Sequence, residues 1–253
     1  MRCGVFDTRK GSAFIEMGAT KVVCTIDGPK EPSKSMDTDC SEGVINVQVV
    51  GVAGLSHVIE SALRAIIALE HLSKQAMTQS HLTVVAVLLV SLIVHSSPSS
   101  AIYFKMQVDV EVTVLEDDGG VLAAALMCSS LALCNAGIQT LDFCVAAHVI
   151  ITEDGSLKLD ASSSEGDGCA SVTVALMPSL KQNVCCEHRG ISTLKQFKSA
   201  LSLAAKSSLY LWPVLKNAIT YQSSGASHCK LDALNSHYLL VDVAKNETRG
   251  VLL

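Results

Sequence analysis

The chain has 253 residues, of which 49% are hydrophobic and 17% are charged, and its formal net charge is −5. This length is enough for one large core or two small domains. The acidic balance argues against a free-standing nucleic-acid binder, which usually carries a basic excess.

The ten cysteines are placed like small hydrophobic residues and not like disulfide partners or zinc ligands. Cys24, Cys128, Cys134 and Cys144 lie inside apolar runs, and there is no Cys-x-x-Cys pair. The first twelve residues lack the apolar core of a signal peptide. These features predict a reducing intracellular compartment. No cofactor is expected.

The first part of the chain predicts strands followed by a helix. Two β-rich runs, Ala13–Glu16 and Lys21–Asp27, with Gly18 between them, predict a hairpin. A further strand is predicted over residues 43–50. Apolar residues at helical spacing predict a helix over residues 57–72.

The middle of the chain contains a helix that is apolar on nearly all sides. Alternation of apolar and polar residues predicts a half-buried strand over residues 106–116. The run "VLAAALMCSSLALCNAG" predicts a buried helix over residues 121–137, with Gly137 as its C-terminal cap. Its only polar side chains are those of Ser129, Ser130 and Asn135. A helix of this kind is normally buried on nearly all sides.

The last third returns to strands and ends in a long helix. Residues 141–152 predict a strand pair or one bent strand, and residues 170–178 predict a strand. Residues 192–221 predict a helix with Ser192 as its N-cap and a kink at Pro213. Strands and helices mix without strict alternation, which predicts the α+β class.

Two segments do not fit this pattern. Residues 75–104 are an atypical apolar insertion, in which the apolar run Leu82–Val94 has only thirteen residues. A membrane-spanning helix needs about 20, so a buried segment is favoured over a membrane anchor. A translated sequence outside the natural mature chain is the third interpretation. Residues 224–253 are an unassigned C-terminal tail, and the whole chain, 1–253, is interpreted as a single domain.

Four segments occur in the order seen in RNase PH-like proteins. They are "GSAFIEMGATKVVCTIDGPKE", "VTVLEDDGGVLAAALMCSSLALCNAGI", "VTVALMP" and "LYLWPVL". The first resembles the opening hairpin of that family. The other three are most similar to its exosome component six branch, ring subunits of the eukaryotic RNA exosome. The resemblance covers roughly residues 9–74 and 105–222.

The resemblance implies the RNase PH-like fold, related to ribosomal protein S5 domain 2, with mixed sheets and packed helices. It also implies a place in a six-subunit ring, beside other RNase PH-like subunits and cap subunits. Such a complex processes ribosomal RNA and degrades RNA from the 3′ end in the nucleus, nucleolus and cytoplasm. RNA would reach the chain through the assembled ring, and no membrane contact is expected.

Active members of this family cleave RNA with inorganic phosphate, and their glycine turn continues as Gly-Gly-Thr-Arg, where the Thr and Arg hold the phosphate. Backbone N–H groups at a helix start attract an anion, and a guanidinium binds its oxygens in pairs. Here Gly119 and Gly120 are followed by Val121 and Leu122, whose side chains donate no hydrogen bond. The turn therefore has the outline of a phosphate site without its main donor.

Active members also place two Asp residues six positions apart beside the strand matched by "VTVALMP". Such carboxylates bind a metal or act as acid and base. Carried over residue by residue, the pair falls on Gly166 and Val172. Glu165 and Asp167 lie next to the first position, but they are interpreted, with the serines around them, as a solvated loop.

The arginine pair that active members carry before the first helix is also missing. The matching stretch, residues 51–58, has only His57, which is interpreted as a surface or cap residue. Four cations near the N-terminus alternate with Asp7 and Glu16 and are interpreted as a solvated face. These cations are Arg2, Arg9, Lys10 and Lys21.

Together the departures favour a non-catalytic structural subunit of the exosome ring over an active phosphate-dependent 3′-exoribonuclease. No catalytic, metal-binding or cofactor-binding residue is assigned, and the RNA-binding residues are left open. A contribution to an active site shared with a ring neighbour also stays open. A membrane-associated protein that uses residues 82–94 is a third alternative, which the short length of the run disfavours.

Overall fold

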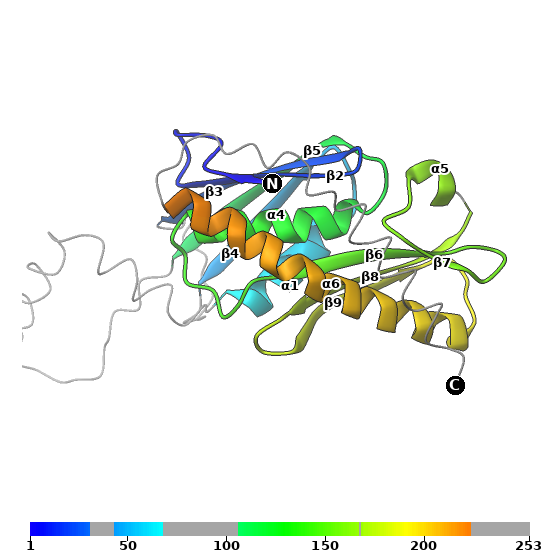
Figure 1. Ribbon diagram of the computed structural model, residues 1–253. Coiled ribbons are helices and arrows are strands. Elements are labelled where there is room, and N and C mark those ends of the chain that lie inside the picture. The colour runs from blue at the N-terminus through cyan, green and yellow to red at the C-terminus, as the bar shows by residue number, and fades with distance from the viewer. Residues whose placement is uncertain (31–42, 68–105, 167, 224–253) are drawn as a thin grey trace, which may run out of the picture.

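The computed structural model describes residues 1–30, 43–67, 106–166 and 168–223. Its strands form two sheets, with one helix between the sheets and others beside them (Figure 1). The insertion at 75–104 and the tail at 224–253 lie outside the described residues. No helix among those that are described is long and apolar enough to cross a membrane.

The first sheet has five strands in the order β1-β2-β3-β5-β4. Neighbouring strands are antiparallel except β4, which runs parallel to β5. The strands are β1 (Arg2–Cys3), β2 (Gly11–Met17), β3 (Thr20–Lys30), β4 (Val44–Val50) and β5 (Gln107–Glu116). The predicted hairpin is confirmed as β2 and β3, with Gly18 in the left-handed region at φ 57°.

The second sheet has four antiparallel strands in the order β7-β6-β8-β9. They are β6 (Val145–Ile151), β7 (Leu157–Leu159), β8 (Ala170–Met177) and β9 (Gln182–Arg189). The helices are α1 (Ser56–Ile66), α4 (Val121–Asn135), α5 (Ser163–Gly166) and α6 (Leu194–Ser223). The predicted α+β class is confirmed, whereas β1, β7 and β9 were not predicted.

Residues 141–152 contain one strand, β6, and not a strand pair. The strand starts only at Val145 because the preceding residues are held in a connection by the buried Asp142. Its carboxylate accepts hydrogen bonds from the backbone N–H groups of Ser179 at 2.7 Å and Leu180 at 3.3 Å. A charged group with such partners is a strong local constraint, and it joins the loop before β6 to the turn after β8.

Both amphipathic helices differ from their predictions at one end. Helix α1 ends at Ile66, because Ile67 is extended and forms a β-bridge with Thr140, and residues 68–72 of the predicted helix lie outside the described residues. Helix α6 is capped by Thr193 and not by Ser192. The Thr193 N–H donates to the Gln196 side chain at 3.0 Å while the Gln196 N–H donates back to Thr193 Oγ1 at 3.4 Å, a capping box. The helix continues through Pro213.

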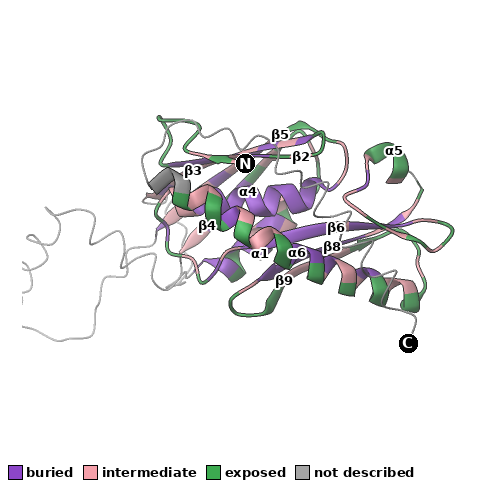
Figure 2. Ribbon diagram, in the orientation of Figure 1, coloured by how far each residue is buried: buried purple, intermediate pink, exposed green. Residues whose placement is uncertain are grey.

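Helix α4 is the centre of the molecule. It contacts β2 and β3 of the first sheet and β6 and β8 of the second, and 13 of its 15 residues are buried (Figure 2). Its C-terminal end is closed as predicted by Gly137 at φ 71°. The Ile138 N–H donates to the Leu133 carbonyl at 3.1 Å, which is the pattern of a Schellman cap.

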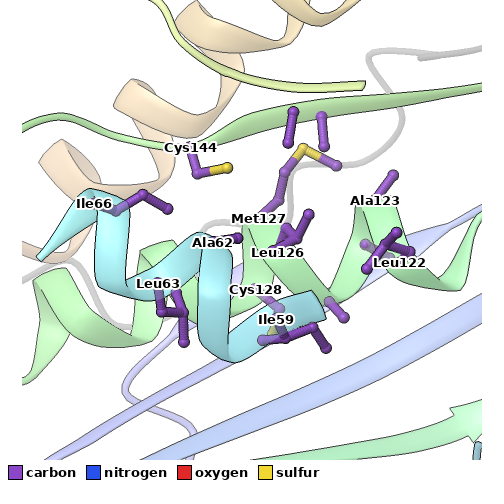
Figure 3. Packing of buried hydrophobic residues seen from close by; sticks show 14 of the residues in the cluster. Ile59, Ala62, Leu63, Ile66, Leu122, Ala123, Leu126, Met127, Cys128 and Cys144 are labelled. Atoms are coloured by element: carbon purple, nitrogen blue, oxygen red, sulfur yellow. The ribbon is translucent and has the colours of Figure 1, made fainter. Parts of the chain in front are cut away.

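Close packing around α4 explains its small side chains. Helix α1 packs against α4, and the side chains of Ile59, Leu63 and Ile66 of α1 and of Leu122 and Leu126 of α4, labelled in Figure 3, are all buried. On the other side β2 passes α4 closely, so that a side chain at Gly11 would collide with the Ala132 carbonyl and the Ala136 methyl group. Packing of this density leaves no room for larger residues.

The cysteines within this core are apolar packing groups. Cys24, Cys128 and Cys144 are completely buried, whereas Cys134 is only half-buried. Burial raises the pKa of Cys24 and of Cys144 to about 12. Thiols with such a pKa stay protonated at neutral pH, and they are therefore poor nucleophiles and poor metal ligands.

The chain itself supplies the surroundings that the apolar helix α4 requires. A helix that is apolar on nearly all sides can be covered by a partner subunit or by its own chain, and here the chain's own two sheets cover it. The exposed large apolar side chains lie elsewhere, and among them Ile191 is 99% and Leu194 is 69% exposed.

We predict that Leu133→Asp abolishes folding of the chain. Leu133 is completely buried in α4, and an unpaired carboxylate there combines a cavity with an uncompensated charge, at a cost of roughly 4 kcal/mol or more. Circular dichroism during urea unfolding measures the effect, with Ile191→Asp as the matched control on the surface. A Leu133→Asp variant that unfolds at the same urea concentration as the control would contradict the central position of α4.

Candidate functional site

A cavity of about 290 Å³ lies where the turn before α4 meets the second sheet. The turn Asp117–Gly120 and the first residues of α4 form one wall. Strands β6, β8 and β9 form the opposite wall, and the segment around α5 closes one side. The strand, glycine turn and helix singled out in the sequence therefore do border a cavity.

Hydrogen bonds within the chain hold the turn in place. The Thr20 hydroxyl of β3 donates to the Gly119 carbonyl at 2.7 Å and accepts from the Asp118 N–H at 3.1 Å. The Gly119 N–H donates to the Asp117 carboxylate at 3.0 Å. Two backbone donors of the turn are thus already bound by groups of the same chain, and one of these groups is an anion.

Gly120 is required by its conformation. It occupies the N-cap position of α4 in the left-handed region at φ 65°, which favours glycine. A Cβ atom at this position would lie 3.4 Å from the His148 Cβ and 3.0 Å from the Asp160 carboxylate. The glycine therefore serves the close approach of the turn to β6, whether or not an anion binds.

The residues after the glycines form an apolar wall. Val121 and Leu122 are 7% and 6% exposed, and both line the cavity. Their side chains belong to the apolar core cluster, and they offer the cavity no side-chain donor. The backbone N–H groups at the helix start are the only donors that this segment can contribute.

The carried-over carboxylate positions separate in the structure. Val172 is completely buried in the core and does not line the cavity. Its neighbours Ser171 and Thr173 do, because successive residues of a strand point to opposite faces. Gly166 also lines the cavity, and a Cβ atom there would lie 2.8 Å from the Cδ1 of Ile150, the end of a flexible side chain that would have to shift.

The acidic residues next to Gly166 have different positions. Glu165 forms an ion pair with Lys158 at 3.1 Å, and both side chains are about half exposed. This contact agrees with the interpretation of a solvated segment. Asp167 lies outside the described residues.

A polar row across three strands was missed in the sequence. His148 of β6, Thr173 of β8 and Glu187 of β9 are paired neighbours in the sheet. The His148 Nδ1 lies 2.8 Å from the Thr173 hydroxyl. Glu187 accepts a hydrogen bond from the Arg189 Nε at 2.9 Å and forms an ion pair with the Arg189 Nη2 at 2.9 Å. Glu187 of this row and its partner Arg189 place one carboxylate and one guanidinium at the cavity.

The charge of the cavity is slightly negative. Among the residues that the structure describes, the charged ones that line it are Asp117, Glu187 and Arg189, two anions and one cation. Burial lowers the pKa of His148. The positive charge of Arg189 lowers this pKa further, whereas the negative charge of Glu187 raises it. The net shift is downward, so that the imidazole is neutral at pH 7. A net negative lining repels a phosphate ion, and the guanidinium is already paired with Glu187.

The residues of this polar row were not predicted for a common reason. Strand β9 has no apolar alternation, since "QNVCCEHR" lies at the edge of its sheet and is largely exposed. A hairpin predicted from β8 and the residues after it is the one route by which Glu187 could have been placed opposite Thr173. His148 gives no signal of its own within the apolar run of β6.

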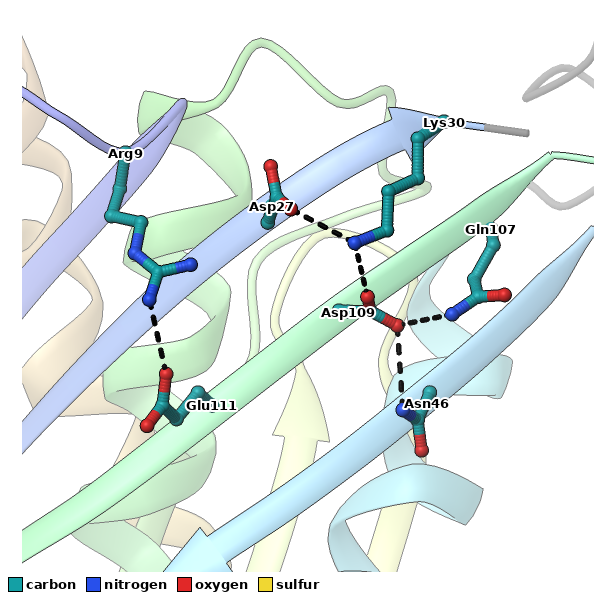
Figure 4. Close-up of polar contacts among 7 residues, drawn as sticks. All are labelled: Arg9, Asp27, Lys30, Asn46, Gln107, Asp109 and Glu111. Atoms are coloured by element: carbon teal, nitrogen blue, oxygen red, sulfur yellow. Dashed lines mark hydrogen bonds and ion pairs between the residues drawn. The ribbon is translucent and has the colours of Figure 1, made fainter. Parts of the chain in front are cut away.

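The basic residues of the N-terminal region do not form a groove. Arg9 lies 3.6 Å from Glu111, and Lys21 lies 2.7 Å from Glu116. These pairs lie on the outer face of the first sheet, and Figure 4 shows the Arg9 pair close to a network around Asp109. Half-exposed ion pairs of this kind are worth about 0–1 kcal/mol each. The interpretation as a solvated face is supported for both residues.

Within the described part of the chain, the cation of the Asp109 network is paired. Lys30 binds the carboxylates of both Asp27 and Asp109 (Figure 4). Burial by itself would raise the pKa of Asp109, but hydrogen bonds from Lys30, Gln107 and Asn46 outweigh it and hold that pKa below its ordinary value. The hollow that these residues line, about 190 Å³, has three carboxylates (Asp27, Asp109 and Glu111) against two cations (Arg9 and Lys30) among the described residues.

Two further predictions concern His57 and the binding of metal ions. His57 is exposed, and the N-cap of α1 is Leu55, so His57 is a surface residue and not a cap. Among the residues that the structure describes, no group of three His, Cys, Asp or Glu side chains could hold a metal ion.

Comparison with known proteins places this geometry in a family. Residues 1–139 match the RNase PH family, described as 3′ exoribonuclease family, domain 1. The chain is 28% identical over 230 residues to the exosome complex component ski6 of Schizosaccharomyces pombe, which covers 89% of this chain and 87% of the relative.

Solved structures show the same fold. The chain matches the crystal structure of rice (Oryza sativa) Rrp46 with a TM-score of 0.63 and 19% identity, covering 85% of this chain and 90% of that one. An archaeal exosome core matches with a TM-score of 0.63 and 20% identity, covering 85% of both chains. The predicted RNase PH-like fold is confirmed, and the match over more than half of its length shows that the chain belongs to the 3′ exoribonuclease (RNase PH) family.

Proposed function

We propose that this chain is a non-catalytic structural subunit of an exosome-type ring, and that it supports 3′-to-5′ RNA processing and degradation by the assembled complex. Its partners are other RNase PH-like subunits and cap subunits, and RNA reaches it through the ring. The alignment with a relative named as an exosome complex component, over most of both chains, supports this place. The proposed localisation is the nucleus, nucleolus and cytoplasm, with no membrane contact.

The observation that carries the non-catalytic part is Leu122. It lines the cavity in the position where active members of the family, by the resemblance, place a phosphate-binding arginine. Loss of one preorganised donor typically lowers a rate by about 10² to 10³. The negative lining adds to this loss, because Asp117 and Glu187 outnumber Arg189.

Arg189 favours a second candidate function, which is a contribution to an active site shared with a neighbour. Its side chain is 61% exposed beside the cavity, although it is paired with Glu187. A guanidinium at a rim can bind an anion presented by another subunit. The same residue would have to act in an active phosphorolytic enzyme, because among the described residues that line the cavity Arg189 is the only side-chain cation.

We predict no phosphorolytic activity for the purified chain. Without a side-chain donor from Val121 or Leu122, single-stranded RNA and inorganic phosphate should yield no nucleoside diphosphates above background. Chromatography of the reaction products measures this outcome, with Arg189→Ala as the companion variant. Phosphate-dependent release of nucleoside diphosphates by the natural chain, lost in Arg189→Ala, would show that the cavity is an active site.

We also predict that the chain assembles with RNase PH-like partners. Within the described residues, β4 and β9 each lie at the edge of a sheet, and a strand edge presents unpaired N–H and C=O groups to another chain. Co-expression with candidate partners, followed by size-exclusion chromatography with light scattering, should give a stable hetero-oligomer. A thermally stable monomer with no affinity for any of these partners would contradict the ring proposal.

A further inference from the structure

Helix α6 has an unusual charge composition. Its 30 residues include four lysines and no Asp or Glu. The chain as a whole has a net charge of −5, so this helix opposes the overall balance. The lysines are Lys195, Lys198, Lys206 and Lys216.

The four lysines share one face of the helix. All four are exposed, whereas Ala200, Ala204 and Leu215 are buried beneath the helix, which packs on β6 and β8. At about 100° per residue the four lysines fall within a sector of roughly 80°. From Lys195 to Lys216 this lysine face extends for about 32 Å at roughly 1.5 Å per residue, and Figure 2 shows exposed residues along the length of α6.

The stability of the fold does not explain this charge. Lys195, Lys198 and Lys216 form no ion pair with any other described residue. Lys195 and Lys198 also lie at the start of the helix, where the dipole is positive and cations are unfavourable. Two lysines in this position oppose helix formation, so the lysine face needs another explanation.

Apolar side chains lie within and directly beside the lysine face near its centre. Leu209 is 49% and Tyr210 is 54% exposed, and both lie between Lys206 and Lys216. An exposed tyrosine beside an exposed leucine is typical of the centre of a protein interface, with charged residues at the rim. The combination describes a surface with an apolar centre and cations on both sides.

We propose that the exposed face of α6 is a docking surface for an acidic amphipathic segment of a partner protein. Carboxylates of the partner meet the lysines, and its apolar side chains cover Leu209 and Tyr210. Charge complementarity selects an acidic partner. A nucleic acid is disfavoured because the lysines after Lys198 are about 12 and 15 Å apart at 1.5 Å per residue, whereas one strand of duplex carries a charge about every 3.4 Å.

A synthetic peptide tests the surface without knowledge of the natural partner. The probe is a labelled helix-forming peptide of about 21 residues, enough to follow the lysine face, with a row of glutamates beside a row of leucines. Fluorescence anisotropy measures its binding to the full chain, in the assembled complex if the chain requires one. A scrambled peptide of the same composition and a single-stranded oligouridylate serve as comparison ligands.

Two variants of the face and one matched control separate the contributions. The first combines Lys195→Ala, Lys198→Ala and Lys216→Ala, and the second combines Leu209→Ser and Tyr210→Ser. The control combines Lys10→Ala, Lys158→Ala and Lys181→Ala, which removes the same charge from exposed lysines outside α6. All substituted side chains are at least partly exposed, so thermal unfolding should be nearly unchanged.

The expected result is salt-sensitive binding of the amphipathic peptide that falls at least tenfold in both variants of the face. The control should bind within about twofold of the natural chain, and the scrambled peptide should bind more weakly. An equal loss in the control, or no saturable binding at low salt, would overturn the proposal. Tighter binding of the oligouridylate, lost in the lysine variant, would overturn it in favour of a nucleic-acid surface.

Discussion

The burial of α4 between the two sheets is the constraint on which the rest of the structure depends. Both sheets contact this helix, so its side chains must be apolar and often small, and β2 needs Gly11 to pass beside it. The turn Asp117–Gly120 connects β5 to α4 and must place the first residues of the helix between the sheets. The fold therefore requires a glycine turn at this place even when no phosphate binds there, and Thr20 holds that turn.

Elements with a clear local pattern of residues could be predicted from the sequence. The hairpin of β2 and β3 and the buried helix α4 follow from patterns within their own residues. Strand β9 could not be predicted, because it is polar and exists through its pairing with β8. The same difference explains why only part of the candidate site was predicted. The glycine turn and Leu122 are local features of the sequence, whereas Glu187 and Arg189 line the cavity only because β9 pairs with β8.

The distribution of charge assigns different roles to different surfaces. The cavity combines an apolar wall with a slight excess of carboxylates, which disfavours an anionic substrate. On the first sheet, each of three cations forms an ion pair with a carboxylate. These cations are Arg9, Lys21 and Lys30. The lysine face of α6 has no acidic residue in its own helix. The ring and docking proposals both rest on this contrast between the cavity and the lysine face.

The central claim is that the glycine turn is a structural joint and not a phosphate site. Calorimetric titration of the purified full chain with inorganic phosphate tests this claim without the need for RNA or a partner. The expected result is no saturable heat for either the natural chain or Arg189→Ala. Saturable binding of phosphate by the natural chain, abolished by Arg189→Ala, would contradict it.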